Sequence, residues 1–458
     1  MDERSAALKK LSETTQLLLD TTGRGLDLAE ADLANLDLSG ADLRRATLNR
    51  AVLHGTVLKD ADLSEITMVC PGMERCDLSG ATLRSAYVHA LAMQTCNLDG
   101  ADLTGLRDAT GSLFHGCSMR GTQWAGSQLA GAAFYQCDLR RAALPRVNLQ
   151  GATINECLLN HATLEGARVD QLTVTKSSLR GTSLRGAGGR GLVLQRLTGA
   201  DDLVLAEAGL PGLRLDTVRG RSWSAAGLQA VGADWCDLAL DDADLRGADL
   251  GGISLRRSAL NQADLRGAVL SDGKITATAM REVNLSGATA ENLHLVESDL
   301  SGADLTSLIG RCLTVRDSDL SGARLRNANL YRAMITGDPP RGMRLRGADL
   351  ENATLVQATV AADLREARLT GANCAYSRFS QSDLTGAVLN GAALHQSTWV
   401  KVVARGASLA GVRAPIFADR CPGLDEAVRK TAGGTAEELG SFLRTFAEAL
   451  ATARSGST

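Results

Sequence analysis

The chain has 458 residues, of which 44% are hydrophobic and only 3% aromatic, with 48 glycines, 10 cysteines and a formal net charge of −3. An ordinary hydrophobic share excludes general disorder, a near-neutral charge gives no sign of nucleic-acid binding, and no stretch approaches the roughly 18 apolar residues of a membrane span. So few aromatic side chains argue against conventional domains of ~150 residues each and favour a repeat that buries aliphatic and small side chains.

Residues 2–20 precede the repeat and have the pattern of an amphipathic helix, with Leu8, Leu11 and Leu18 on one side. We expect residues 1–22 to form a helical cap, because the open end of a stack of strands needs a cover. This N-terminus lacks the basic and apolar regions of a signal peptide. We therefore expect a cytoplasmic protein in which the cysteines are reduced thiols.

From about residue 26 to about residue 414 the sequence repeats every five residues: a small residue, a short polar residue, Leu, and two mostly polar residues that often end in Gly. Examples are Ala31–Leu33, Ala41–Leu43, Ala61–Leu63, Ala243–Leu245 and Ala348–Leu350. A period of five fits neither a helix nor a half-buried strand. It favours a chain that turns a corner every five residues, with Leu and the small residue inward and Asp or Asn and Gly building the turn. Stacked coils with parallel pairing would bury the inward residues.

This A-(D/N)-L-x-x signature resembles the pentapeptide-repeat family. The resemblance implies an all-β solenoid, a right-handed quadrilateral parallel β-helix of about 19 coils of 20 residues, with short helical caps at both ends. Such a stack, at ~4.8 Å per coil, would be roughly 90 Å long.

The phase of the repeat changes three times. One extra residue lies near Gly116 and another near Ala200, and one residue is missing between Val360 and Leu364. We divide the repeat into an N-terminal half, residues 23–200, and a C-terminal half, residues 201–415.

Five cysteines form a ladder in the predicted stack. Cys76, Cys96, Cys117, Cys137 and Cys157 each lie two residues before a repeat centre and are 20 or 21 residues apart. One hypothesis is a metal or redox wire, and the other is that thiols fill slots that elsewhere hold Ala. We favour the second, because a parallel column gives poor disulfide geometry and no His or acidic ligand accompanies the thiols.

The repeat is poorest between about Gly186 and Trp235, where we expect a kink or a bulged loop. Residues 186–191 match G-x-G-x-x-G, but repeats precede them and no helix follows, so we assign no nucleotide site. None of the six histidines pairs with a second ligand at metal spacing, and no catalytic motif occurs. We expect no catalytic residues, no metal and no cofactor, and therefore no enzyme.

Charged residues recur 20 apart on the outer faces. In the C-terminal half the candidate interaction face consists of Arg246, Arg266, Arg326, Arg346 and Arg365, beside a column that begins Asp244 and Asp264. A second arginine column, Arg120, Arg140 and Arg180, lies in the N-terminal half. These columns are either a docking face or ladders of Arg and Asp that solvate each other. We favour the ladders, because exposed ion pairs contribute little.

A candidate recognition loop lies within Gly337–Gly342, at Asp338, Pro339, Pro340 and Arg341. Pro lacks the amide donor that a ladder needs, so this segment should bulge from one corner without changing the phase. Residues 416–458 should form a helical cap or a dimerisation element. Thr435 and Glu438 match a capping box. The candidate contact residues of the following helix are Leu439, Phe442, Leu443, Phe446 and Leu450.

These patterns predict a non-catalytic rod that binds a protein partner, with no direct binding to nucleic acid or membrane, and with the C-terminal helix as a site for a homodimer. The family resemblance implies a more specific alternative, in which the chain imitates DNA and protects DNA gyrase or topoisomerase IV from a poison. Interleaved Arg argues against that alternative, because duplex DNA presents a continuous line of negative charge. An enzyme or accessory protein of a biosynthetic pathway is the remaining alternative.

Overall fold

The computed structural model describes residues 25–338, 342–412 and 416–431. The chain forms two compact units, Met1–Ala230 and Val231–Thr458, and each is described here by itself. The predicted division after residue 200 therefore does not coincide with the boundary between the units.

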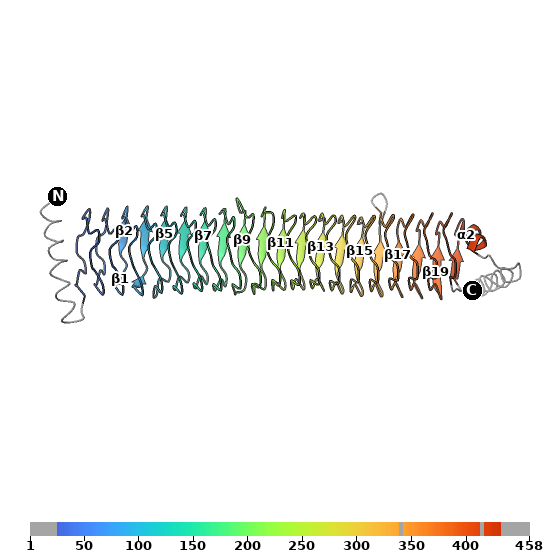
Figure 1. Ribbon diagram of the computed structural model, residues 1–458, viewed down its shortest axis with the longest axis horizontal. Coiled ribbons are helices and arrows are strands. Elements are labelled where there is room, and N and C mark those ends of the chain that lie inside the picture. The colour runs from blue at the N-terminus through green and yellow to red at the C-terminus, as the bar shows by residue number, and fades with distance from the viewer. Residues whose placement is uncertain (1–24, 339–341, 413–415, 432–458) are drawn as a thin grey trace, which may run out of the picture. The chain divides into compact units, whose positions relative to one another are not determined.

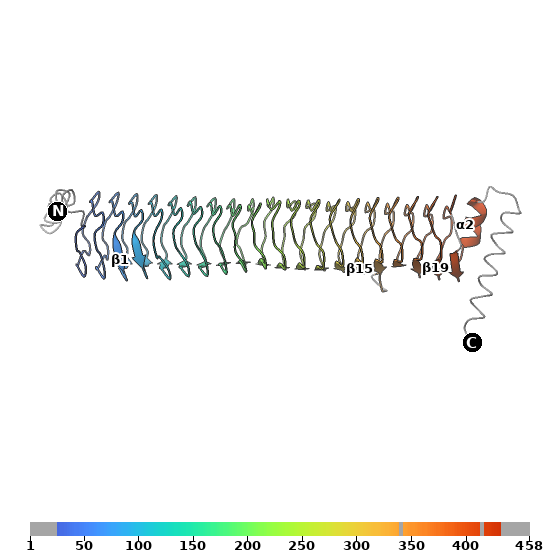
Figure 2. The same ribbon diagram turned by 90° about the horizontal axis from the view of Figure 1, so that it is seen from below.

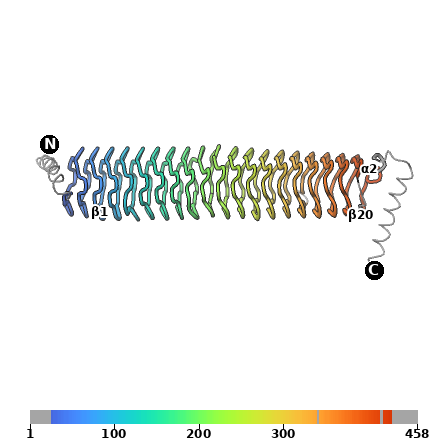
Figure 3. Tube along the Cα trace, turned by 60° about the horizontal axis from the view of Figure 1, so that its bottom comes forward, coloured from blue at the N-terminus to red at the C-terminus, as the bar shows by residue number. Residues whose placement is uncertain are grey.

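In each unit the repeats wind into coils that stack in chain order (Figure 1 and Figure 3). Four parallel bridges join one coil to the next, and for the first coil they are Asp27↔Thr47, Asp32↔Val52, Asp37↔Val57 and Asp42↔Asp62. Each coil therefore has four sides of five residues, and the predicted parallel β-solenoid is confirmed.

One side of most coils is a short strand. In unit 1 the strands are β1 (Thr67–Val69), β2 (Gly72–Glu74), β3 (Tyr87–His89), β4 (Ala92–Gln94), β5 (Leu113–His115), β6 (Ala133–Tyr135), β7 (Thr153–Asn155), β8 (Thr173–Thr175), β9 (Val193–Gln195) and β10 (Arg214–Asp216). In unit 2 they are β11 (Asp234–Cys236), β12 (Ser254–Arg256), β13 (Lys274–Thr276), β14 (His294–Val296), β15 (Thr314–Arg316), β16 (Met334–Thr336), β17 (Thr359–Ala361), β18 (Arg378–Ser380), β19 (Ser397–Val400) and β20 (Ile416–Asp419). These strands mark about 17 turns. The first turns of unit 1 carry single bridges instead, which accounts for the larger predicted number of coils.

The turns explain why the residue before each Leu is short and polar. Asp62 Oδ1 accepts a hydrogen bond from the amide of Ser64 at 3.0 Å, and many Asp and Asn side chains do the same. The last residue of a repeat adopts a positive φ, which is 68° at Gly80. Glycine is common there because it reaches this conformation without steric cost.

The interior of each coil is filled mainly by Leu and Ala, and rings enter it only under particular conditions. Phe114 and Phe134 stack with centroids 4.8 Å apart, and Trp124 meets Phe114 edge-on at 5.8 Å. Trp223 is buried beside Gly220, where a Cβ would lie 2.6 Å from the indole nitrogen. The glycine at this otherwise aliphatic position therefore makes room for the indole ring.

The first phase change lies earlier than predicted. An extra residue near Gly116 would leave Leu113 inward, but Leu113 is 42% exposed and its neighbour Phe114 is fully buried. The extra residue is Asp108, whose φ of 52° carries the chain outward before the next side begins. The later two changes lie where the repeat phase predicts them.

The predicted kink between Gly186 and Trp235 is wrong for the part that lies in unit 1. Strand β9 pairs in register with β8, and β10 pairs in register with β9. Gly209 continues the regular bridging to Gln229. Most glycines of this segment occupy corner and side positions, and Gly189 and Gly220 stand at repeat centres in place of larger residues, so the weak repeat signature here reflects small residues and not a break in the coils.

The predicted bulge at Gly337–Gly342 is an insertion of one whole repeat. Asp319 pairs with Arg344, 25 residues later, whereas the preceding coil has 20 residues and the following coil, which contains the missing residue, has 19. Asp338 is exposed, and its amide donates to Asp317 Oδ1 at 2.7 Å. Because the insertion has five residues, the phase is unchanged. The candidate loop residues Pro339, Pro340 and Arg341 lie outside the described residues.

The C-terminal end of unit 2 carries a short helix, α2 (Leu424–Thr431), beside the last coils (Figure 2). Leu424 and Ala427 are buried, and the Gly423 backbone packs against Arg405 of the preceding coil. The predicted N-terminal cap, residues 1–22, lies outside the described residues. The predicted contact helix also lies outside them, with Leu439, Phe442, Leu443, Phe446 and Leu450.

Candidate interaction surfaces

All five arginines of the predicted interaction face form ion pairs. Three of them fold back onto the Asp two residues earlier in the chain, with closest N–O distances of 2.6 or 2.7 Å: Arg246–Asp244, Arg266–Asp264 and Arg365–Asp363. In each of these pairs, two guanidinium nitrogens bond the two carboxylate oxygens. The D-L-R order within one repeat is therefore the sequence signal for this pairing.

The five arginines do not form one column, which corrects the prediction. Asn327 N–H donates to Glu351 O, so the coil neighbour of Arg326 is Glu351. Arg326 pairs with Glu351 at 3.0 Å and with Asp349 at 2.7 Å. Arg346 lies one column away, next to Arg365. The five inserted residues at 338–342 leave four bridged sides in this coil but lengthen the spacing between stacked residues to 25, so residues 20 apart across the insertion no longer stack.

Arginine also neutralises acidic side chains elsewhere on the outer faces. The hydrogen bond from Arg257 lowers the pKa of the Asp237 carboxyl to about 2. In unit 1, Arg120 pairs with Asp99 and Arg140 pairs with Asp138. Acidic and basic side chains thus lie next to each other on the outer columns, and the arginines neutralise the neighbouring carboxylates. These columns do not present the continuous acidic face that imitation of duplex DNA would need.

The predicted cysteine ladder is buried. Its five thiols, Cys76, Cys96, Cys117, Cys137 and Cys157, are free and no more than 2% exposed. Cys157 Sγ accepts the amide hydrogen bond of Cys137 at 3.3 Å and lies 3.3 Å from the carbonyl oxygen of Asn155, to which it donates. Hydrogen bonding to Cys137 and burial raise the pKa of the Cys117 thiol to about 12.

At the same column position, five coils of unit 2 hold a hydroxyl residue, whereas Met343 and Ala362 occupy it in two others. The hydroxyl residues are Ser258, Thr278, Ser298, Ser318 and Ser382. Ser298 Oγ accepts the amide hydrogen bond of Thr278 at 3.3 Å and donates to Val296 O at 3.0 Å. Because thiols and hydroxyls make the same contacts at this place in the coil, the contacts favour the structural interpretation of the cysteine ladder over a redox or metal wire.

A polar cluster surrounds Asp108, the residue inserted at the first phase change. Its carboxylate accepts a hydrogen bond from Tyr87 Oη at 3.1 Å and lies 2.9 Å from His89 Nδ1. The hydrogen bond from His89 lowers the pKa of the Asp108 carboxyl. This cluster could not be anticipated, because the sequence phase placed the inserted residue elsewhere.

Neither metal nor nucleotide chemistry is assembled by these side chains. Within the part of the chain that the structure describes, no three His, Cys, Asp or Glu side chains are grouped as metal ligands. The glycine-rich residues 186–191 belong to a coil, in which Gly188 bridges to Arg168 and Gly209, and Gly189 adopts a φ of 154° close to the Asp170 amide. The segment does not form the loop before a helix that would hold a phosphate.

The strand side of unit 1 exposes apolar side chains. At the first position of successive strands the outward column reads Val52, Gly72, Ala92, Leu113, Ala133 and Thr153. Val52 is 48% and Leu113 42% exposed. Beside Leu113, in the column of third positions, Tyr135 is 37% exposed. We call this surface the strand face.

The strand face contains a shallow hollow of about 560 Å³ between its larger side chains. Gly72 and Ala92 form its floor, and His54, Glu74, Leu113, His115 and Tyr135 are among its walls. The residues spaced 20 apart in the sequence could have indicated this exposed apolar face. The phase predicted before Gly116 was incorrect and assigned Leu113 to the core, so the face was not predicted.

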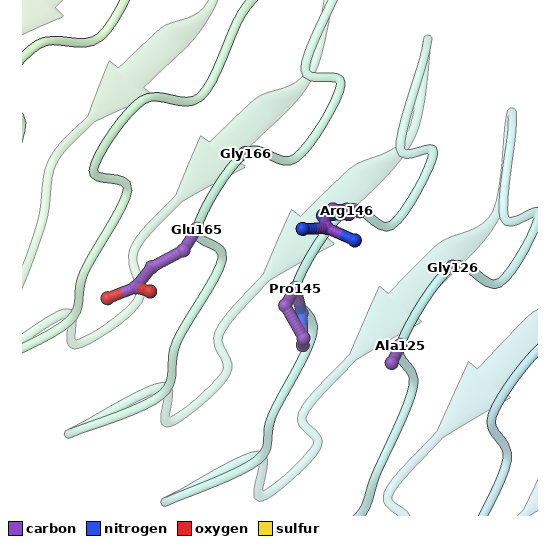
Figure 4. A pocket seen from close by; sticks show the side chains of 6 residues that line it. All are labelled: Ala125, Gly126, Pro145, Arg146, Glu165 and Gly166. Atoms are coloured by element: carbon purple, nitrogen blue, oxygen red, sulfur yellow. The ribbon is translucent and has the colours of Figure 1, made fainter.

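A second hollow, of about 670 Å³, lies on a corner of unit 1 (Figure 4). Three successive coils contribute Ala125 and Gly126, then Pro145 and Arg146, then Glu165 and Gly166. The side chains of Arg146 and Glu165 extend in different directions and do not converge on a common point (Figure 4). The hollow results from missing side chains at Gly126 and Gly166, and no ligand site is built there.

Comparison with known proteins identifies the repeat. The family model described as pentapeptide repeats matches eight copies, in residues 27–64, 110–144, 239–276, 278–308 and 362–398. No curated protein matches the chain.

Solved structures of several pentapeptide-repeat proteins are similar at low identity. QnrB1, a plasmid-mediated fluoroquinolone resistance protein, is 19% identical, over 43% of this chain and 97% of its own, with a TM-score of 0.27. HetL, involved in heterocyst differentiation regulation in the cyanobacterium Nostoc, is 22% identical over 61% and 90%, with a TM-score of 0.17. Rfr23 from the cyanobacterium Cyanothece is 25% identical over 28% and 85%, with a TM-score of 0.18.

Proposed function

Because the chain belongs to the pentapeptide-repeat family, we propose that it is a non-catalytic scaffold that binds proteins through the outward sides of its coils. The observation that carries this proposal is the strand face. Val52, Leu113 and Tyr135 lie exposed on a regular surface. The inward residues of the same coils form the core, so these three side chains are not needed to fill it. Exposed apolar groups on an extended solenoid surface are typical of protein contacts.

The scaffold proposal is tested by cross-linking in cells that make the full chain, followed by identification of the linked peptides. We expect links from residues of the strand face to a protein other than this chain. Leu113→Asp should remove these links, and Leu158→Asp, which is 40% exposed on another side, should keep them. If no other protein is linked to any described side of the coils, the scaffold proposal is wrong.

Protection of a type II topoisomerase is the alternative that the family resemblance implied, and it requires a different assay. Supercoiling by DNA gyrase is measured with a fluoroquinolone and increasing amounts of the chain. We expect no relief of inhibition, because the arginine pairs interrupt the acidic columns. Relief of inhibition would replace the general scaffold proposal with a protective role.

We also propose that the protein works in a reducing compartment such as the cytoplasm, since all ten cysteines are free. In the described part of the chain, no helix has the length and apolar character to cross a membrane. Fractionation of cells that make the full chain tests the location, and recovery from an oxidising compartment would contradict it.

A further inference from the structure

The strand face of unit 1 alternates large and small side chains along the coil axis. Val52 and Leu113 project from it, while Gly72 and Ala92 between them leave the hollow. Beyond Leu113 the column continues with Ala133 and Thr153. A surface that has a projection and a depression in one column can receive the projection of a second copy in its depression.

Consider a two-fold axis that lies in the strand face, runs along the strand direction and passes between Ala92 and Leu113. This axis brings the projecting side chains of one copy over the small side chains of the other. It reverses the coil direction and keeps each column opposite itself. Leu113 of one copy then lies over the hollow between Gly72 and Ala92 of the other, one and a half coils away. Val52 lies over the short side chains of Ala133 and Thr153.

The neighbouring column is complementary under the same axis. It reads His54, Glu74, Gln94, His115 and Tyr135. His115 of one copy faces Glu74 and Gln94 of the other, which places an imidazole opposite a carboxylate. Tyr135 faces His54 and Glu74, so its hydroxyl meets an acceptor. No two like charges lie opposite each other in these two columns.

We propose that two copies of this chain associate antiparallel through their strand faces, with Leu113 of each copy seated over Gly72 and Ala92 of the other. The inference deepens the proposed function and rests on it for the role of this face. It names a second copy of this chain as the occupant of the strand face in the purified protein, where no other protein competes for that face. This contact is separate from any contact through the termini.

The area of the face indicates a weak dimer. The complementary strip spans about six coils, or roughly 30 Å at ~4.8 Å per coil, and one side of a coil is roughly 12 Å wide. Each copy then buries several hundred Å², which is less than the ~800 Å² per partner of a standard interface. We expect dissociation in the micromolar range.

Sedimentation velocity of the full chain across the micromolar range tests this arrangement. Leu113→Asp should weaken association at least ~10-fold, because it places a charge in the depression of the other copy. Ala92→Leu should weaken it similarly by filling the depression. Both residues are exposed, so the fold should be retained, and circular dichroism checks this.

Matched controls on other sides of unit 1 separate this surface from a general effect. Leu158→Asp and Ala143→Leu make the same chemical changes on different columns and should leave association unchanged. His115→Glu should weaken association by facing Glu74, and the double variant with Glu74→His should recover it, because each residue meets the other across the axis.

Two results would overturn the inference. One is a wild-type chain that stays monomeric at all concentrations, which would leave the scaffold proposal standing with a different protein on the face. The other is a dimer that Leu113→Asp and Leu158→Asp affect equally, which would place the contact elsewhere. If self-association is lost with Leu113→Asp while no other protein is ever cross-linked, the inference stands and the scaffold proposal fails.

Discussion

Cys157 illustrates how one inward side chain serves the coils on either side of it. It accepts the amide hydrogen bond of Cys137 from the preceding coil, and its own amide donates to Ser177 Oγ in the following coil at 3.0 Å. Many inward amides donate to the carbonyl three residues back, but in several coils the amide two residues after the strand donates to a side chain of the next coil, as those of Cys137, Cys157 and Thr278 do. A buried amide without an acceptor is costly.

We predict that Cys157→Ser preserves the stability of unit 1, and that Cys157→Ala lowers it by about 1–3 kcal/mol, because alanine leaves the Cys137 amide unpaired. Thermal unfolding followed by circular dichroism measures both variants. The serine variant is the matched control, since it keeps an acceptor of similar size. Equal melting temperatures for the two variants would show that the hydrogen bond does not matter.

The exposed ion pairs make a second prediction at the residue scale. The pKa of Asp237 is about 2, below its ordinary value of 3.8, because Arg257 donates to the carboxylate. A carboxyl with a lowered pKa stabilises the fold above pH 3.8, and the contribution is lost as the pH falls from 3.8 to about 2.

Arg257→Gln should therefore raise the pKa of Asp237, which NMR titration of its side-chain carboxyl measures. Arg281→Gln is a suitable control, because Arg281 pairs with a different carboxylate, Asp299. An unchanged titration of Asp237 in the Arg257 variant would assign the lowered pKa to other neighbours.

Among the elements, the inserted repeat after β16 has the largest effect on which residues of different coils stack. A Cβ on Gly337 would lie 2.2 Å from the amide nitrogen of Met343, so the two ends of the insertion are adjacent. The coil on either side continues without it. The insertion nevertheless decides which residues of unit 2 stack, because it lengthens the spacing between stacked residues from 20 to 25.

We predict that deleting residues 338–342, which joins Gly337 to Met343, leaves the fold intact and changes stability by less than about 1 kcal/mol, because Gly337 and Met343 are already adjacent and no bridge between coils uses the deleted residues. Deleting Ser301–Leu305 is the matched control. It has the same length but removes the buried Ala303 and Leu305, and it should unfold unit 2. Comparable melting temperatures for the two deletions would contradict the assignment of the insertion.

Sequence alone predicted the solenoid, the column of cysteines and the phase of this insertion. It could not predict that Arg326 and Arg346 belong to different columns. A five-residue insertion and an ordinary side of a coil have the same phase, and only the pairing of Asp319 with Arg344 distinguishes them. The error at Leu113 had a similar origin, because an extra residue is visible only after the phase has changed.

At the scale of the whole chain, each unit is a stack in which a coil contacts only its neighbours. Opening an inner coil breaks two sets of contacts, so buried groups should become accessible only when neighbouring coils also open. The reactivity of exposed groups does not depend on the opening of coils. The ten thiols sample both classes, since Cys70 and Cys312 are exposed and six others are buried.

We predict that Cys70 and Cys312 react rapidly with a disulfide reagent at mildly alkaline pH in the native protein. The thiols of Cys76, Cys96, Cys117, Cys137, Cys157 and Cys374 should react only on unfolding, because they are buried. Absorbance of the released thiolate counts the reactive groups, and the Cys70→Ser/Cys312→Ser variant removes the rapid phase. Fast reaction of the ladder in the native protein would mean that inner coils open singly.

The repeat pattern was sufficient to give the period, most inward and outward positions, and therefore the class of fold, because a period of five is a local property that recurs in every repeat. Leu113 was an exception. The repeat pattern also identified Arg and Asp as neighbours in the D-L-R repeats. The tertiary structure alone decided which residues of different coils stack, how Leu113 and Ala92 come to share one exposed face, and where the arginine column breaks. These depend on the number of residues between successive coils, and one inserted residue or repeat changes every later neighbour.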